Sequence, residues 1–118
     1  MRLEVDEPGS RVAAAIDRDG TIIGLATAGV PREGDAPTAW ELYSINVVAE
    51  RRGSGVADDL FRVVVGDGDG DTAVWVLTDN ARAWSFYSRH GFRTDGATTV
   101  GEVTGSREIR MVRRPAER

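Results

Sequence analysis

A glycine turn near the middle of the chain constrains the possible folds more than any other feature. Gly53 and Gly55 bracket Ser54, between a β-like stretch that ends at Val48 and a helix-like stretch that begins at Val56. The first turn of a helix has unpaired N–H groups and a partial positive charge, and glycine lets a ligand approach the backbone. A strand, a glycine turn and a helix in this order predict an α/β layout with a phosphate-binding turn.

The residues before this turn have the composition of β-strands. The turn residues Asp19-Gly20 separate two apolar stretches and indicate a hairpin, and residues 31–37 form a polar loop with two prolines. Pro8-Gly9 interrupts the first ten residues, which we expect to add at most a weak edge strand. The main strands are predicted over residues 11–17, 21–30 and 40–48.

Helical periodicity begins after the turn. Apolar residues at i, i+4, i+7 and i+8 start at Val56 and predict a helix that ends at Gly66. Residues 72–77 predict a buried strand, and Asp79 or Asn80 can cap a second helix. That helix has Ala83, Phe86 and Tyr87 on one face and stops at Gly91. Closing strands are predicted over 92–93 and 107–114, joined by the stretch 96–106.

The composition excludes several classes of protein. The chain has 118 residues, which fits one domain over residues 1–118, and it contains no cysteine for a disulfide, a thiolate zinc site or a cysteine nucleophile. Its formal net charge is -4 and its basic residues, all arginine, form no stripe, which argues against nucleic acid as the partner. No apolar run approaches the ~20 residues of a membrane helix, so a cytoplasmic protein is expected.

The glycine turn does not fit the common nucleotide motifs. A Walker loop needs Lys-Ser/Thr after its last glycine, where this chain has Val56-Ala57. A dinucleotide-binding fingerprint needs a third glycine at the position of Asp58 and an early βαβ unit. Two glycines before a helix are also common as a purely structural turn, and this alternative stays open on the turn alone.

Two segments together resemble the GNAT acetyltransferase superfamily. Its cofactor motif, Arg/Gln-x-x-Gly-x-Gly/Ala, is matched by residues 52–57, which read Arg-Gly-Ser-Gly-Val-Ala. A second motif, Asn-x-x-Ala-x-x-Phe-Tyr followed by Gly-Phe, is matched from Asn80 to Tyr87 and at Gly91-Phe92. The resemblance covers roughly residues 11–113. It implies a mixed, mostly antiparallel sheet that is splayed at its centre, with two main helices.

The resemblance also implies a ligand and its contacts. Acetyl-CoA would fill the gap between the splayed strands, with its pyrophosphate on the amides of residues 52–57. The strand that ends at Val48 would offer backbone groups to the pantetheine arm, and the second helix would hold that arm from the other side. The implied cofactor-binding residues are Ile45, Val47, Val48, Arg52, Gly53, Ser54, Gly55, Val56, Ala57, Asn80, Ala83, Phe86 and Tyr87.

The implied reaction is acyl transfer from a thioester to the amine of a small molecule or peptide. Tyr87 would protonate the leaving thiolate, and a strand amide such as that of Val47 would polarise the carbonyl. Glu41 is the candidate base, with Tyr43 as a substitute. Tyr87 as simple core packing and Glu41 as a solvated surface carboxylate are the alternatives, as is a module that binds acetyl-CoA without efficient chemistry.

Other polar residues have simpler interpretations. His90 stands at a helix end, where a cation is favourable to the helix dipole, so a capping role is expected. Asp58 and Asp59 favour a helix start but would repel a pyrophosphate, so we expect both to point outward. Asp67 and Asp69 alternate with glycine as in a calcium loop, but the twelfth position lacks the required glutamate. No metal site is predicted.

The chain departs from the family pattern at its front. Family members usually have a strand and two helices before the hairpin, and only ten residues precede Arg11 here. The chain is therefore expected to be a shortened form or a minimal member, with a thin acceptor side. The uncovered sheet would expose an apolar patch, from which we predict a homodimer.

Overall fold

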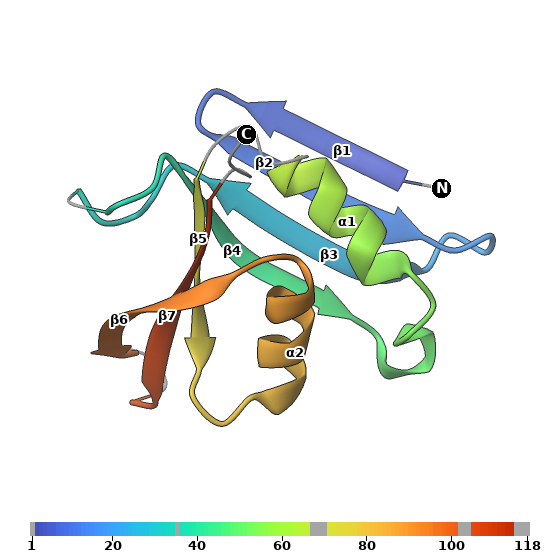
Figure 1. The fold of residues 1–118 in the computed structure, drawn as a ribbon. Coiled ribbons are helices and arrows are strands. Elements are labelled where there is room, and N and C mark those ends of the chain that lie inside the picture. Colours follow the sequence, from blue (N-terminus) through green and yellow to red (C-terminus); the bar gives the residue numbers. More distant parts are fainter. Residues whose placement is uncertain (1, 35, 67–70, 102–104, 115–118) are drawn as a thin grey trace.

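A single seven-stranded sheet organises the protein (Figure 1). The computed structural model describes residues 2–34, 36–66, 71–101 and 105–114. The strands follow the order β1-β2-β3-β4-β5-β7-β6, and only the β4–β5 pair is parallel. The elements are β1 (Arg2–Glu7), β2 (Ser10–Ile16), β3 (Ile22–Gly29), β4 (Trp40–Val47), the 3-10 turn η1 (Ala49–Arg51), α1 (Val56–Val65), β5 (Thr72–Leu77), α2 (Ala81–Arg89), β6 (Arg93–Val100) and β7 (Arg107–Arg113).

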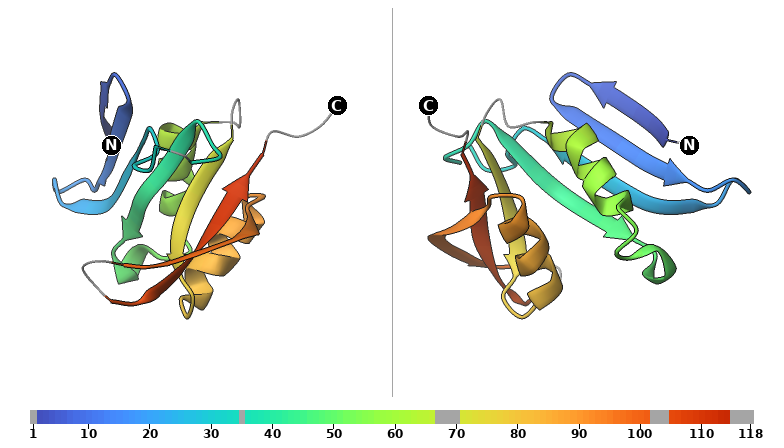
Figure 2. Two further views of the ribbon diagram at one scale, coloured as in Figure 1. Left: turned by 90° about the vertical axis from the view of Figure 1, so that its left-hand side faces the viewer. Right: turned by 45° about the vertical axis from the view of Figure 1, so that its right-hand side comes forward.

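The sheet is open at its centre. β4 and β5 pair only from Trp40 to Leu42 on β4, and beyond Leu42 the two strands separate (Figure 2). A bulge lies at the same point, because Thr27 and Ala28 of β3 pair with Ser44 and Leu42, so that Tyr43 is the extra residue. A bulge bends its strand and increases the local twist. The predicted splay at the centre of a mixed sheet is therefore present.

The two helices belong to different halves of the sheet. α1 packs on β2, β3 and β4, and α2 lies beside the half formed by β5, β7 and β6 (Figures 1 and 2). The apolar face of α1 buries Leu60, Phe61 and Val64 completely or almost so. Trp40, at the start of β4, donates from Nε1 to the Val64 carbonyl oxygen at 2.9 Å. The core therefore fixes α1 to the first half of the sheet.

The structure confirms one prediction about the strands and corrects another. The expected edge strand is β1, and Pro8-Gly9 ends it with a tight turn to β2, with Gly9 at a φ of 85°. The strand predicted over 92–93 is instead β6, which continues to Val100 through a bulge at Gly96. Almost all of β6 is exposed, so it lacks the apolar alternation by which a strand is recognised in a sequence.

Two further predictions lie partly or wholly outside the described residues. Asp67 and Asp69 fall in the range 67–70, and the linking stretch 96–106 includes residues 102–104. Within the described ranges, no three or more His, Cys, Asp or Glu side chains cluster as metal ligands would. Both α1, with 10 residues, and α2, with 9, are far shorter than a membrane-crossing helix.

Candidate functional site

A cavity of about 710 Å³ lies where β4 and β5 separate. The end of β4, the glycine turn, the start of α1 and one face of α2 enclose it, so both halves of the sheet contribute to its wall. It is lined by Ile45, Asn46, Val47, Arg51, Arg52, Gly53, Gly55, Ala57, Asp58, Asn80, Arg82, Ala83, Ser85, Phe86, Tyr87 and Arg89.

The glycine turn presents unpaired amides at one end of this cavity. Gly53 and Gly55 have φ angles of 78° and 93°, in the left-handed region that favours glycine. Gly55 is the N-cap of α1 and no side chain caps this end of the helix. The first helical hydrogen bond is donated by Asp59 to the Gly55 oxygen at 3.0 Å. The N–H groups of Gly53 and of residues 55–58 donate to no residue that the structure describes and can take an anion, whereas those of Arg52 and Ser54 are already bonded to the Ala49 and Arg51 oxygens.

Edge peptide groups of β4 line the opening between the strands. The Val48 N–H donates to Ile23 on β3 at 2.9 Å. Successive N–H groups of a strand point to opposite edges, so those of Val47 and Ile45 point away from β3 and toward the gap. Since β5 pairs with β4 only as far as Leu42, β5 leaves these groups available to a ligand.

Arginine side chains make the cavity wall cationic. Arg52 and Arg82 are exposed and form no ion pair with any residue that the structure describes, whereas Arg51 is paired with Asp17. Guanidinium groups suit phosphate because they donate two parallel hydrogen bonds. The predicted cofactor residue Asn80 caps α2, with its Oδ1 accepting from the Ala83 N–H at 3.1 Å, and its amide NH₂ is left for a ligand.

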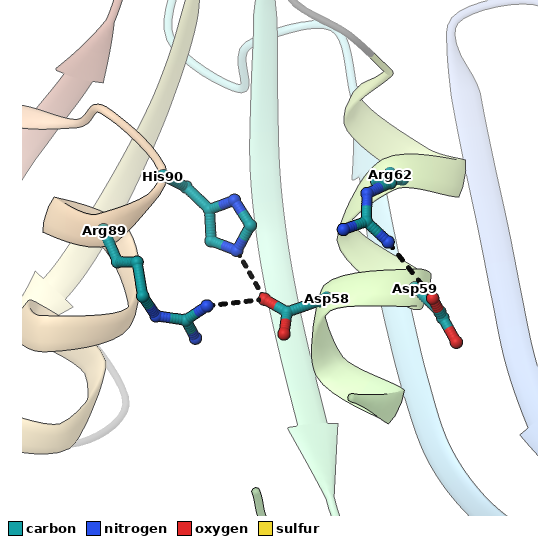
Figure 3. Close-up of polar contacts among 5 residues, drawn as sticks. All are labelled: Asp58, Asp59, Arg62, Arg89 and His90. Atoms are coloured by element: carbon teal, nitrogen blue, oxygen red, sulfur yellow. Dashed lines mark hydrogen bonds and ion pairs between the residues drawn. The ribbon is translucent and has the colours of Figure 1, made fainter. Parts of the chain in front are cut away.

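Asp58 does not point outward as predicted. It lines the cavity, where its Oδ1 accepts from His90 Nε2 at 2.7 Å and from Arg89 at 3.1 Å (Figure 3). Burial alone would raise the pKa of Asp58, but the hydrogen bonds from His90 and Arg89 outweigh it and hold the pKa below its ordinary value. Asp59 does point outward, toward Arg62 on its own helix.

Tyr87 is a buried side chain that reaches the cavity. It is 7% exposed, and its ring packs against Phe86 and Phe92. Its hydroxyl forms no hydrogen bond to a described residue, and no described side-chain oxygen is both buried and unpaired, so this hydroxyl keeps some exposure in a residue that lines the cavity. Burial disfavours the phenolate and raises the pKa of Tyr87 to about 12.

Glu41 lies outside this cavity. Trp40 and Leu42 face α1, so Glu41 between them points to the opposite face of the sheet. Its side chain is 4% exposed and forms an ion pair with the mostly exposed Arg32 at 3.0 Å. The structure therefore brings Glu41 together with Arg32 and not with Tyr87 at the cavity wall.

Most of the other predicted cofactor residues converge on the cavity. The three that do not line it have local contacts that explain their placement. The Ser54 hydroxyl donates back to the Arg51 oxygen, Val56 packs against the core, and Val48 is 37% exposed beyond the end of β4. Their roles stay predictions.

Several lining residues were not predicted from the sequence: Asn46, Arg51, Asp58, Arg82, Ser85 and Arg89. The spacing of Arg82, Phe86 and Arg89, at i, i+4 and i+7, places them on one face of α2 and could have indicated them. Nothing local marks Asp58, because its partners are 31 and 32 residues away in sequence.

A sequence comparison identifies the family. The model of the acetyltransferase (GNAT) family matches residues 2–92, which is most of the chain. The chain belongs to the GNAT acetyltransferase family. The GNAT prediction from the two motifs is thus confirmed, and the match begins at residue 2, before the predicted start near Arg11. No curated protein matches the chain by sequence.

Solved structures of acetyltransferases have the same fold. Nourseothricin acetyltransferase is 24% identical with a TM-score of 0.72; the match covers 92% of this chain and 66% of that one. Arabidopsis thaliana NAA60 in complex with a bisubstrate analogue is 20% identical, with a TM-score of 0.72 and coverage of 92% and 78%. Arabidopsis thaliana NAA60 in complex with acetyl-CoA is 20% identical with a TM-score of 0.66; the match covers 88% of this chain and 75% of that one.

These comparisons confirm the predicted fold class and support acetyl-CoA as the cosubstrate expected for the family. The GNAT protein described here spans about two thirds of the length of nourseothricin acetyltransferase. Its β1 passes to β2 through a two-residue turn, with no helix between these two strands.

The burial of Tyr87 predicts that its phenol loses its proton at an unusually high pH. In Tyr43→Phe, Tyr87 is the remaining tyrosine of two, and its phenolate absorbance should appear near pH 12 rather than near the ordinary pH of about 10. Circular dichroism at each pH would establish that the chain is still folded. The raised pKa also means that this group stabilises the fold below about pH 10, and that its contribution is lost as the pH rises through 12. Titration near 10 in the folded protein would contradict the assigned burial.

Proposed function

We propose that the protein binds acetyl-CoA in the cavity between β4 and β5 and transfers the acetyl group to an amine of a small molecule or peptide. One observation carries this proposal: a cationic, glycine-lined helix start and a buried, protonated tyrosine line the same cavity. Membership of the GNAT family supports the general reaction. The proposed acceptor is an amine of either a small molecule or a peptide.

The two ends of the cavity suit the two ends of the cosubstrate. Within the predicted run 52–57, the unpaired amides of Gly53 and residues 55–57, together with the guanidinium of Arg52, would hold the pyrophosphate. The gap-facing peptide groups of Ile45 and Val47 would bond the pantetheine arm as a neighbouring strand would. Asn80, Ala83 and Phe86 would contact the arm from α2.

The chemistry needs a polarised carbonyl and a protonated leaving group. The neutral amine attacks the thioester carbonyl carbon, and the Val47 N–H would stabilise the negative charge that forms on its oxygen. The C–S bond then breaks, the sulfur leaves with the electron pair, and the amine loses its proton to a base. At neutral pH the phenol of Tyr87 is fully protonated and would donate to this sulfur.

The raised pKa of Tyr87 affects how it acts. An ordinary thiol has a pKa of about 8.5, well below the value of about 12 for Tyr87. Full proton transfer to a solvated thiolate would therefore be uphill. We assign Tyr87 a hydrogen bond that strengthens as charge grows on the sulfur, with the proton following as burial in the cavity makes the thiolate more basic.

Glu41 is proposed as the base that removes the amine proton, directly or through water. It would act from the face opposite α1, where an acceptor would approach the splayed strands. The ion pair with Arg32 has to open for this role, and Arg32, whose side chain is 65% exposed, can move into solvent. A sensor or partner subunit that binds acetyl-CoA without efficient chemistry is the alternative function.

Binding is tested by thermal unfolding with and without acetyl-CoA. A ligand at 100 times its dissociation constant adds about 2.7 kcal/mol of stability, so the midpoint should rise by several degrees. Arg52→Glu should weaken binding about tenfold or more, because it places a carboxylate beside the pyrophosphate. Arg11→Glu is a matched charge reversal at the start of β2, where the side chain lies over Trp40 at the end of the sheet remote from the cavity, and it should bind as the wild type does. An unchanged midpoint for the wild-type protein would contradict both candidate functions.

Turnover separates the enzyme from the binding module. Tyr87→Phe should lower kcat about 100-fold while the Kd for acetyl-CoA stays within about twofold, since one hydroxyl is lost and the ring packing is kept. Glu41→Gln should likewise lower kcat with little effect on Kd. Both quantities come from initial rates and calorimetry. Unchanged turnover in Tyr87→Phe would remove Tyr87 as the acid, and no turnover in the wild type with any amine tested would favour the binding module.

A homodimer is proposed from the face of the sheet opposite α1. Gly24 faces α1, so Leu25 points to the opposite face, where its side chain is 43% exposed. Val5, 52% exposed, extends this apolar surface onto β1 beside its partner Val12. A second copy of this chain would cover these side chains.

Oligomeric state tests this surface. Light scattering should give twice the mass of the 118-residue chain, and Leu25→Glu should shift it to the monomer, because a buried carboxylate at the contact is costly. Arg11→Glu, whose side chain lies over Trp40 on the α1 side of the sheet, again serves as the matched surface control. A wild-type monomer at micromolar concentration that does not bind a hydrophobic dye would contradict the proposed dimer.

A further inference from the structure

The two walls of the cofactor cavity belong to parts of the fold that the sheet connects only weakly. α1 is fixed to β2, β3 and β4, whereas α2 follows β5 in the other half. The halves share three residue pairs between β4 and β5, all at the end remote from the cavity. Something other than the sheet therefore has to set the distance between α1 and α2.

His90, at the C-cap of α2, makes the direct link to α1. Asp58 of α1 bonds its Nε2 at 2.7 Å, and Phe61 of α1 stacks on its ring with centroids 4.3 Å apart and planes at 25°. Asp58 and Phe61 are three residues apart, so they lie on one face of α1. They hold the imidazole by its edge and by its face. The side chains of His90 and Asp58 are 16% and 25% exposed, so the link is largely shielded from water.

Arg89 strengthens the same link. It donates to the Asp58 oxygen that also accepts from His90 (Figure 3). Its guanidinium also lies over the Phe86 ring, 5.3 Å from the centroid. Asp58, Phe86 and Arg89 all line the cavity, and Tyr87 follows Phe86 directly. The link therefore joins the helix start that faces the pyrophosphate to the helix that carries the proposed acid.

We propose that Asp58 and His90 are a positioning pair that sets the width of the cavity, so that one acetyl-CoA molecule reaches the α1 amides and Tyr87 at the same time. The inference rests on the proposed acetyl-CoA site. It explains why a carboxylate stands at an anion-binding helix start: the charge of Asp58 is offset by Arg89, and its oxygen holds α2 in place.

The negative charge of Asp58 would also repel the phosphates of acetyl-CoA, and this effect would weaken binding, whereas positioning of α2 would strengthen it. If its carboxylate acted only by repelling the phosphates, its removal would tighten acetyl-CoA binding, and Asn and Ala would be equivalent replacements. If it positions α2, Ala loses the link, whereas Asn keeps a side-chain oxygen that can accept a hydrogen bond from the Nε2–H of His90. The two replacements therefore separate geometry from charge.

The experiment measures the Kd for acetyl-CoA by calorimetry and kcat by initial rates. Asp58→Ala should raise Kd about tenfold, equivalent to about 1.4 kcal/mol, and lower kcat about fivefold because Tyr87 is displaced from the sulfur. Asp58→Asn should stay within about threefold of the wild type in both. Asp59→Ala is the matched control: Asp59 is on the same turn but pairs with Arg62 of its own helix, so both constants should be unchanged (Figure 3).

Specific outcomes would overturn the inference. Equal tightening by Asp58→Ala and Asp58→Asn would show that Asp58 acts through repulsion alone, and unchanged constants in Asp58→Ala would show that it has no role. In either case the wild type still binds acetyl-CoA, so the proposed function survives. Absence of binding by the wild type would instead remove the proposed function itself.

His90→Phe tests the pair from the other side, and does so even if Asp58→Ala fails to fold. The substitution keeps an aromatic ring against Phe61 but cannot donate to Asp58. It should raise Kd and lower kcat as Asp58→Ala does. The double variant, Asp58→Ala with His90→Phe, should have the same Kd and kcat as either single variant, because each substitution removes the same link. Wild-type constants in His90→Phe, or additive effects in the double variant, would overturn the pairing.

Discussion

The incomplete pairing between β4 and β5 is the constraint on which the site depends. Three residue pairs join these strands, and past Leu42 the β4 backbone has no β5 partner. Buried peptide groups need hydrogen-bond partners, so strand edges that separate inside a fold are costly unless a ligand or water satisfies them. The bulge at Tyr43 bends β4 at this point. The same defect that interrupts the sheet provides the opening and the donors for an extended ligand.

A split sheet needs other contacts to hold its halves together, and side chains supply them. Phe61 of α1 meets Phe92, Phe86 and His90 from the second half at centroid distances of 4.3 to 6.0 Å. Each such aromatic pair contributes about 0.5–1.5 kcal/mol beyond its burial. Phe86 of this cluster and Asp58, which bonds His90, line the cavity themselves. The packing that stabilises the fold is thus the packing that positions Tyr87.

Much of this could be predicted because it is encoded locally. Gly53 and Gly55 take left-handed dihedrals that few other residues tolerate, and the apolar spacing after Val56 defines the buried face of α1. β6 was missed because its residues are exposed and give no periodic signal. The prediction for Asp58 was wrong for a different reason. Repulsion by a phosphate predicted that its side chain points outward, but attraction to Arg89 and His90, which are far away in sequence, turns it inward.

The sequence by itself therefore determined the glycine turn and the two helices, because each depends on dihedral preferences or spacing within about ten residues. The family and its ligand followed from the resemblance of two short motifs to GNAT proteins. Only the tertiary structure decided how the side chains share the site. It placed Glu41 on the opposite face with Arg32, buried Tyr87 until its pKa rose to about 12, and turned Asp58 inward to His90. These outcomes depend on desolvation and on partners from other elements, which no local pattern specifies.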